Sequence, residues 1–138
     1  MWHLLKIYAL ILLIFLMIDL IWLGRIMVNF YKSELGPLAR LEGDSLAPVL
    51  WAAAVVYLLI PLGIVLFALP RVDAQNMLVS SLSWGFVYGV TLYGVYDMTN
   101  YSLLHKYPLR MAFVDIAWGG VLCAVVTSVA AVIDRWLK

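Results

Sequence analysis

Charged residues are scarce in this chain, and their scarcity excludes most classes of soluble protein. Only 12% of the 138 residues are Asp, Glu, Lys or Arg, whereas 66% are hydrophobic. A soluble domain contains about a quarter charged and about half apolar residues. The formal net charge of +1 also lacks the basic excess of a nucleic-acid-binding protein. The chain therefore requires lipid around it, and we expect no nucleic-acid partner.

Cysteine is nearly absent as well. The single one, Cys123, cannot form an internal disulfide and has no zinc-type spacing around it. Because a free cysteine behaves as a small hydrophobe, we interpret Cys123 as a buried filler. We also find no phosphate loop, no haem-ligand pair and no nucleophile–base pair. The sequence thus predicts no cofactor and no metal ligand, indicates no catalytic residue, and leaves open whether the protein is an enzyme.

Long hydrophobic runs, by contrast, make up most of the chain. A hydrocarbon core about 30 Å thick requires about 20 apolar residues per helix. Four runs are long enough, at residues 4–27, 46–69, 77–101 and 111–137. We therefore predict an all-α membrane protein, a four-transmembrane-helix bundle that forms one domain over residues 1–138. The N-terminus, second connection and C-terminus then share one side of the membrane (side A), and the first and third connections share the other (side B).

Three aspartates interrupt these runs. Asp19, Asp97 and Asp115 lie in the first, third and fourth spans. An acidic side chain at a helix centre costs roughly 2.5–3.5 kcal/mol in lipid, so it is placed against polar groups or water. Asp19 and Asp115 each lie roughly 8 Å inside a flanking arginine on side B, at 1.5 Å per residue. We predict one polar pocket near side B, with these candidate binding residues: Asp19, Trp22, Tyr93, Tyr96, Asp97, Asn100, Asp115 and Trp118.

Three neighbouring carboxylates cannot all stay ionised without compensation, because like charges and desolvation both favour the protonated form. Three interpretations stay open. Proton exchange would suit a proton-coupled carrier or binding protein for an unknown small-molecule ligand. A hard cation such as Mg²⁺ would suit a metal-dependent membrane enzyme acting on a lipid-like substrate. Alternatively, Arg25, Lys106, Arg110 and the tyrosines satisfy the acids in a static network, as in a structural or accessory membrane protein.

Small residues and a proline mark the expected helix contacts. Ser81, Gly85 and Gly89 recur every four residues, a spacing that lets helix backbones approach closely. This ladder predicts either packing inside the bundle or a homo-oligomer face. Pro61 is expected to kink the second span, which otherwise forms a structural wall, and to free a carbonyl for a neighbour.

Two short stretches repeat the same pattern. Residues 19–24 (DLIWLG) and 115–120 (DIAWGG) both read D-x-x-W-x-G, and in each the Asp and the Trp share a helix face. The two spans run in opposite directions, so the relation is inverted, as in many transporters. Three matches in six positions also occur by chance or by similar packing, and both readings stay open.

These motifs, together with residues 96–100 (YDMTN) and Pro108-Leu109-Arg110, resemble a bacterial family of small integral membrane proteins catalogued as domain of unknown function 2177. The resemblance covers nearly the whole chain and implies a multi-pass protein of the bacterial inner (plasma) membrane, surrounded by membrane lipids. It implies no activity. Lys and Arg divide four to side A and five to side B, a weak bias that slightly favours side B in the cytoplasm.

Overall fold

The computed structural model describes residues 2–138, and its regular structure is helical apart from one two-stranded hairpin. Four helices are long and apolar enough to cross a membrane: Trp2–Ile26, Leu50–Arg71, Met77–Leu103 and Leu109–Leu137. This confirms the predicted all-α membrane bundle. The elements in chain order are α1 (Trp2–Ile21), η1 (Trp22–Ile26), α2 (Val28–Leu35), η2 (Gly36–Leu38), β1 (Leu41–Glu42), β2 (Ser45–Leu46), α3 (Leu50–Gly63), η3 (Ile64–Ala68), η4 (Leu69–Arg71), α4 (Met77–Leu103) and α5 (Leu109–Leu137).

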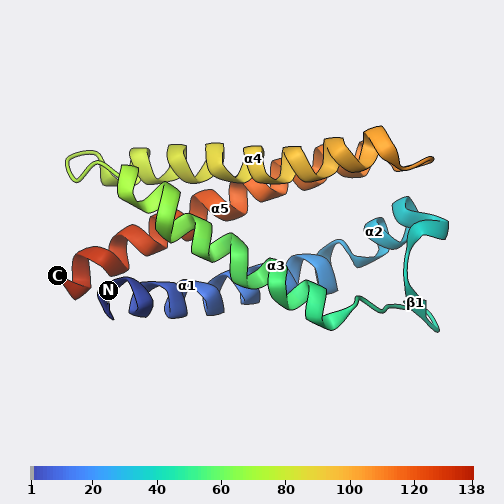
Figure 1. Ribbon diagram of the computed structural model, residues 1–138, viewed down its shortest axis with the longest axis horizontal. Helices are drawn as coiled ribbons and strands as arrows, with labels where there is room; N and C mark the ends of the chain where they lie inside the picture. The colour runs from blue at the N-terminus through green and yellow to red at the C-terminus, as the bar shows by residue number, and fades with distance from the viewer. Residues whose placement is uncertain (1) are drawn as a thin grey trace.

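The two ends of the bundle differ in their connections. Both chain ends lie at the same end of the molecule as the α3–α4 connection, whereas α2, the hairpin and the α4–α5 connection lie at the opposite end (Figure 1). This is the arrangement expected for sides A and B. The second span begins at Leu50 rather than 46, because Ser45–Leu46 pairs with Leu41–Glu42 in the hairpin. The predicted long first connection contains the short helix α2, which ends at Gly36, a residue with a positive φ of 48°.

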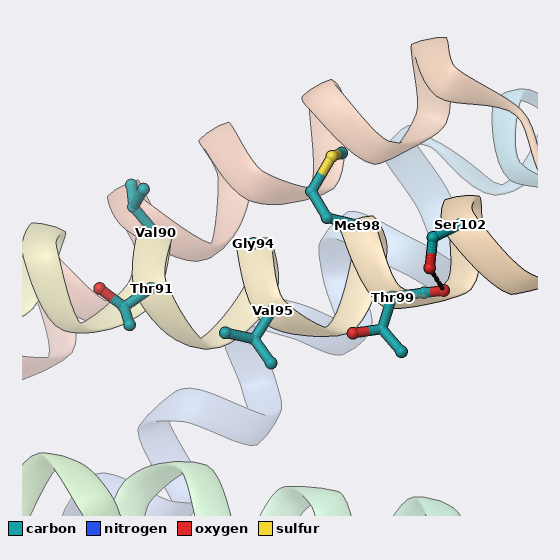
Figure 2. A pocket seen from close by; sticks show the side chains of 7 residues that line it. All are labelled: Val90, Thr91, Gly94, Val95, Met98, Thr99 and Ser102. Atoms are coloured by element: carbon teal, nitrogen blue, oxygen red, sulfur yellow. Dashed lines mark hydrogen bonds between the residues drawn. The ribbon is translucent and has the colours of Figure 1, made fainter.

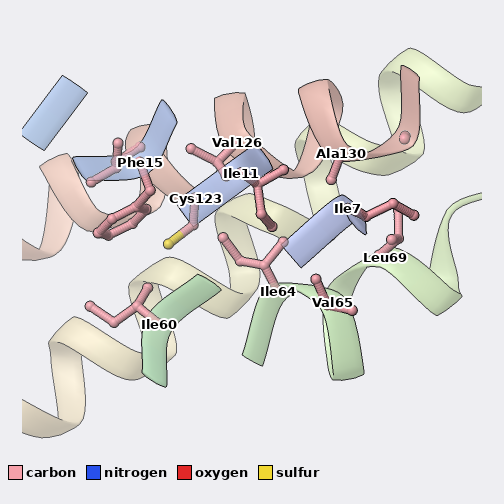
Figure 3. Close-up of a cluster of buried hydrophobic side chains, with 12 residues drawn as sticks. Ile7, Ile11, Phe15, Ile60, Ile64, Val65, Leu69, Cys123, Val126 and Ala130 are labelled. Carbon is pink, nitrogen blue, oxygen red and sulfur yellow. The ribbon is translucent and has the colours of Figure 1, made fainter. Parts of the chain in front are cut away.

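The hydrophobic core lies in the side A half. Ile7, Ile11 and Phe15 of α1 are fully buried against Ile64 of η3 and Val126 of α5 (Figure 3). Cys123 is fully buried in the same cluster, so the structure supports its role as a filler. These side chains carry no nitrogen or oxygen that needs a partner, so close packing holds this cluster together.

The seam between α4 and α5 depends on glycine. A Cβ atom added to Gly85 would lie 2.5 Å from the carbonyl oxygen of Cys123, and one added to Gly89 would collide with the backbone of Gly119. Ser81 is also buried, and its Oγ lies 3.0 Å from Oγ of Ser128. The Ser81/Gly85/Gly89 ladder is therefore covered by α5 of the same chain. This corrects the idea of a homo-oligomer through that face, because the face is not free for a second copy.

Neighbouring hydroxyls reach the carbonyls beside Pro61. The Tyr8 hydroxyl donates to the carbonyl of Leu58, and the Tyr88 hydroxyl donates to that of Ile60, each at 3.1 Å. The helix continues through Pro61 and changes to π-helix at Ile64. The Ile60 carbonyl also accepts from the Ile64 N–H, so the Tyr88 hydroxyl adds a second bond to it. The α3 span is thus tied to α1 and α4 through tyrosines.

Candidate functional site

Asp19 links three helices near the side B end of α1. The Tyr57 hydroxyl of α3 donates to Oδ2 at 2.8 Å, and the Trp118 indole N–H of α5 donates to Oδ1 at 2.9 Å. The carboxyl group is 6% exposed. Each of its oxygens therefore has one neutral donor from a different helix. The second span is more than the predicted structural wall, because it supplies Tyr57.

Asp115 is bound from the side B connection rather than from another span. The Tyr31 hydroxyl of α2 donates to Asp115 Oδ1, and the Trp22 indole N–H donates to the same hydroxyl oxygen at 3.4 Å. Burial, followed by the charge of Asp115, raises the pKa of Tyr31 above its usual range. Tyr31 therefore remains a protonated donor, and its hydrogen bond to Asp115 holds α2 against this end of α5.

The two Asp networks meet at a pair of tryptophans. The rings of Trp22 and Trp118 stack at a centroid distance of 4.0 Å with an interplanar angle of 5°. The contacts are reciprocal: Trp118 of the second D-x-x-W-x-G stretch donates to Asp19 of the first, and Trp22 of the first connects through Tyr31 to Asp115 of the second. The two stretches that sequence analysis paired are thus in direct contact.

Asp97 is the most completely buried of the three acids. Its exposure is 0%, and the Tyr107 hydroxyl donates to Oδ1 at 2.8 Å. Its second oxygen, Oδ2, has no hydrogen-bond partner within residues 2–138. A buried carboxyl oxygen without a partner is costly, so this atom requires an explanation.

Tyr107 joins Asp97 to the rest of the layer. It follows Lys106, whose φ of 65° is unusual for a residue with a side chain, and this turn brings the ring back over the bundle. Tyr107 packs in one buried cluster with Tyr31, Met111 and Ala112. Burial and the neighbouring Asp97 carboxyl raise the pKa of Tyr107 above its usual range, so it too remains a donor.

The structure brings together only part of the predicted set. Asp19, Trp22, Asp115 and Trp118 form one connected group, and Asp97 joins it through the Tyr107 cluster. Tyr93 is half-buried and packs so closely on Gly119 that a Cβ there would collide with its ring. Tyr96 instead is 60% exposed on the outside of α4, and Asn100 is half-buried on the same helix. The Tyr96 ring is thus largely exposed, but its hydroxyl group lies close to Tyr107 and Asn100 at the edge of the layer.

Sequence analysis missed the donors Tyr31, Tyr57 and Tyr107. Tyr57 lies in a span without any charge, where a single hydroxyl was the only signal. Tyr31 and Tyr107 lie in the side B connections, on the same side as the aspartates. Their position in polar loops concealed them, because nothing in a loop sequence indicates that it folds back onto a membrane layer.

The predicted cationic partners do not reach the aspartates. Arg110 lies 3.5 Å from Glu34 and over the ring of Phe30 at 5.3 Å. Within residues 2–138, no salt bridge joins Asp19, Asp97 or Asp115 to a Lys, Arg or His side chain. The hydrogen-bond partners of the three acids are thus tyrosines and a tryptophan, and not Arg25, Lys106 or Arg110.

The donor arrangement does not fit a metal ion. Across the described chain, no group of three or more His, Cys, Asp or Glu side chains is placed to hold one. The carboxylates point to separate phenol and indole donors instead of converging on one position. We therefore derive no chemistry through Mg²⁺ at this layer.

The main cavities lie away from the aspartates. One, of about 540 Å³, is a shallow hollow on the outer face of α4 around Gly94, Val95 and Thr99 (Figure 2). The Ser102 hydroxyl donates to the Thr99 carbonyl of the same helix at 2.8 Å. A second cavity lies at side A. Neither has Asp19, Asp97 or Asp115 among its lining residues; Asp19 and Asp97 are buried, whereas Asp115 is half-buried.

The fold and this layer define a class: a four-span integral membrane protein with buried acids bonded by aromatic donors. The profile of a family described as predicted membrane protein, domain of unknown function 2177 (DUF2177), matches residues 4–132. The chain belongs to this family, as its motifs indicated. No curated protein and no solved structure matches the chain.

Proposed function

We propose that the protein is a small membrane carrier or binding protein that takes up protons at the side B aspartates together with a small-molecule ligand. The observation that carries this proposal is Asp97, a fully buried acid with one oxygen bonded to Tyr107 and the other without a partner. A proton on Oδ2 would neutralise the group without breaking its existing bond.

The donors around the other two acids support the same proposal. Asp19 and Asp115 accept from phenol and indole groups, which serve a carboxyl group in either charge state. A permanently charged static network in lipid normally includes a cation, because unpaired charge is expensive there. An ionisable residue inside a membrane span is also by default a candidate functional group.

Proton uptake can be counted directly. The purified protein in lipid nanodiscs is acidified in the presence of a soluble pH indicator, and protons taken up per chain are compared between wild type and Asp97→Asn. Asparagine keeps an acceptor oxygen for Tyr107 but cannot accept the proton. Asp73→Asn, a change in the exposed α3–α4 connection, is the matched control. Equal uptake by wild type and Asp97→Asn would reject the role of Asp97.

Coupling to a ligand requires a second experiment. A small fluorescent organic cation is the probe, because a cation would supply the charge that the acidic layer lacks. In proteoliposomes with an imposed pH gradient, we expect its accumulation with wild type and its loss with Asp97→Asn. Accumulation that does not depend on the gradient would contradict proton coupling.

A static structural role is the second candidate, and one observation favours it. Each of the three acids already has a hydrogen-bond donor from within the chain. An accessory membrane protein would then show the stability effects of Asp19 described below, but no proton uptake at Asp97. We place either version in the bacterial inner membrane, because its spans are apolar helices rather than the strands of outer-membrane barrels.

A further inference from the structure

A cavity of about 640 Å³ lies at side A, between the ends of all four membrane helices. Its wall is apolar and is formed by residues of α1, η3, η4, α4 and α5, among them Leu4, Val65, Leu69 and Met77. Its mouth carries Asp134, Arg135 and Lys138 from the end of α5. The volume is within the range of about 300–1,000 Å³ that is usual for ligand pockets.

The charges at the mouth leave a cation available. Asp134 Oδ1 lies 2.6 Å from His3 Nε2, and Asp134 Oδ2 lies 2.7 Å from Lys138 Nζ. Among the described residues that line the cavity, Asp134 is the one acid, and both of its oxygens are therefore paired within the chain. Arg135 is exposed and forms no salt bridge with a carboxylate in residues 2–138.

We propose that this cavity binds an anionic phospholipid of the side A leaflet, with an acyl chain along the apolar wall and the phosphate at Arg135, beside the Lys138 ammonium group that also contacts Asp134. A guanidinium group binds phosphate oxygens in a bidentate manner. Basic pockets between membrane helices bind anionic lipid headgroups elsewhere for the same reason. Trp136, which is 86% exposed beside these cations, belongs to the aromatic belt at headgroup level.

The amphiphilic shape selects this occupant over two others. Free phosphate would use the cations but leave the apolar wall without a partner. An uncharged hydrocarbon would contact the apolar wall but would make no electrostatic interaction with Arg135. A phospholipid uses both, and a net negative headgroup avoids adding the ammonium group of a zwitterionic lipid beside the two cations.

Native mass spectrometry of the detergent-purified full chain tests the proposal. We add phosphatidylglycerol or phosphatidylcholine at equal concentration and compare the retained lipid per chain. Wild type should retain phosphatidylglycerol about fivefold better, as expected for the one cation at the headgroup, Arg135, that no carboxylate neutralises. The double variant Arg135→Gln, Lys138→Gln should lose most of this preference. Its control, Arg25→Gln with Lys106→Gln, changes two exposed cations on side B and should keep it.

A second variant tests the apolar wall. Leu4 is 44% exposed, so Leu4→Trp should fold normally and occupy the cavity. It should lower the retention of both lipids. Equal retention of the two lipids by wild type, or an unchanged preference in the Arg135/Lys138 variant, would overturn the proposal. None of these results depends on Asp97, so the outcome is separate from that of the proton experiments.

Discussion

The side A and side B halves of the bundle are held together by different forces. The side A half contains the buried cluster around Ile11, Ile64 and Val126, with no hydrogen bond required of these side chains. In the side B half, Asp19 and Asp115 are bonded to donors from other helices. Packing of apolar side chains is insensitive to pH, whereas a bond to a carboxyl group is not. Within the bundle, the response to protons should therefore begin at side B; the carboxyl contacts at side A are those of Asp134 with His3 and Lys138, at the helix ends.

The largest effect should come from the glycine seam of α4 and α5. Gly89→Ala places a methyl group against the backbone of Gly119, which cannot move aside as a flexible side chain can. We expect a loss of about 1–3 kcal/mol or more in the free energy of unfolding, the usual cost of overpacking. Thermal unfolding in detergent measures it.

Gly94→Ala is the matched control on the same helix. A Cβ at Gly94 has no atom within 4 Å, so this variant should be neutral or slightly more stable. If the two alanine variants unfold at the same temperature, α4 and α5 do not approach through Gly89 and the comparison of the two halves fails.

The next effect should come from the acid that joins three helices. Asp19→Ala removes the acceptor of Tyr57 and Trp118 and leaves two donors unpaired. Leaving a buried donor unsatisfied costs about 1–3 kcal/mol. Asp19→Asn keeps one acceptor oxygen and should lose less, as measured by the same unfolding experiment. An alanine variant as stable as wild type would show that the side B half is not held by this carboxyl group.

Tyr31→Phe should cost about 1 kcal/mol, the usual value of one hydrogen bond. It should also change how the free energy of unfolding falls at alkaline pH. Because the pKa of Tyr31 is raised in the folded protein, its contribution is complete below about pH 10, the ordinary tyrosine value, and is lost as pH rises towards the folded pKa. Wild type should thus lose more stability at high pH than Tyr31→Phe does. Exposed Tyr101→Phe is the control and should follow wild type.

The smallest effect should be at the hairpin. The Lys32 ammonium lies 2.7 Å from Asp44 Oδ1 and lowers the pKa of that exposed carboxyl below its usual value of 3.8. The stabilisation is therefore present above the usual value and disappears as pH falls through the lowered one. Asp44→Asn should speed amide hydrogen exchange at Ala47, whose N–H donates to the Arg40 carbonyl at the base of the hairpin. Exchange in the membrane spans should not change.

The sequence predicted the bundle better than it predicted the site. Four apolar runs of sufficient length leave little choice of fold in lipid, and the depth of Asp19, Asp97 and Asp115 follows from helix rise. The hydrogen-bond partners of these acids could not be predicted from the sequence, because each donor comes from another element and its approach depends on tertiary packing. Tyr96, one residue from Asp97, shows the limit: a helix rotates neighbours by about 100°, so the Tyr96 ring is 60% exposed and only its hydroxyl group approaches Tyr107.

Infrared difference spectroscopy with ¹³C-labelled aspartate tests the central claim most directly. The account predicts that acidification produces the carbonyl band of a protonated carboxyl group, that this band is absent in Asp97→Asn, and that it shifts in Tyr107→Phe, where its hydrogen bond is lost. A band that is unchanged in both variants, or no band at all, would contradict the claim that Asp97 binds a proton.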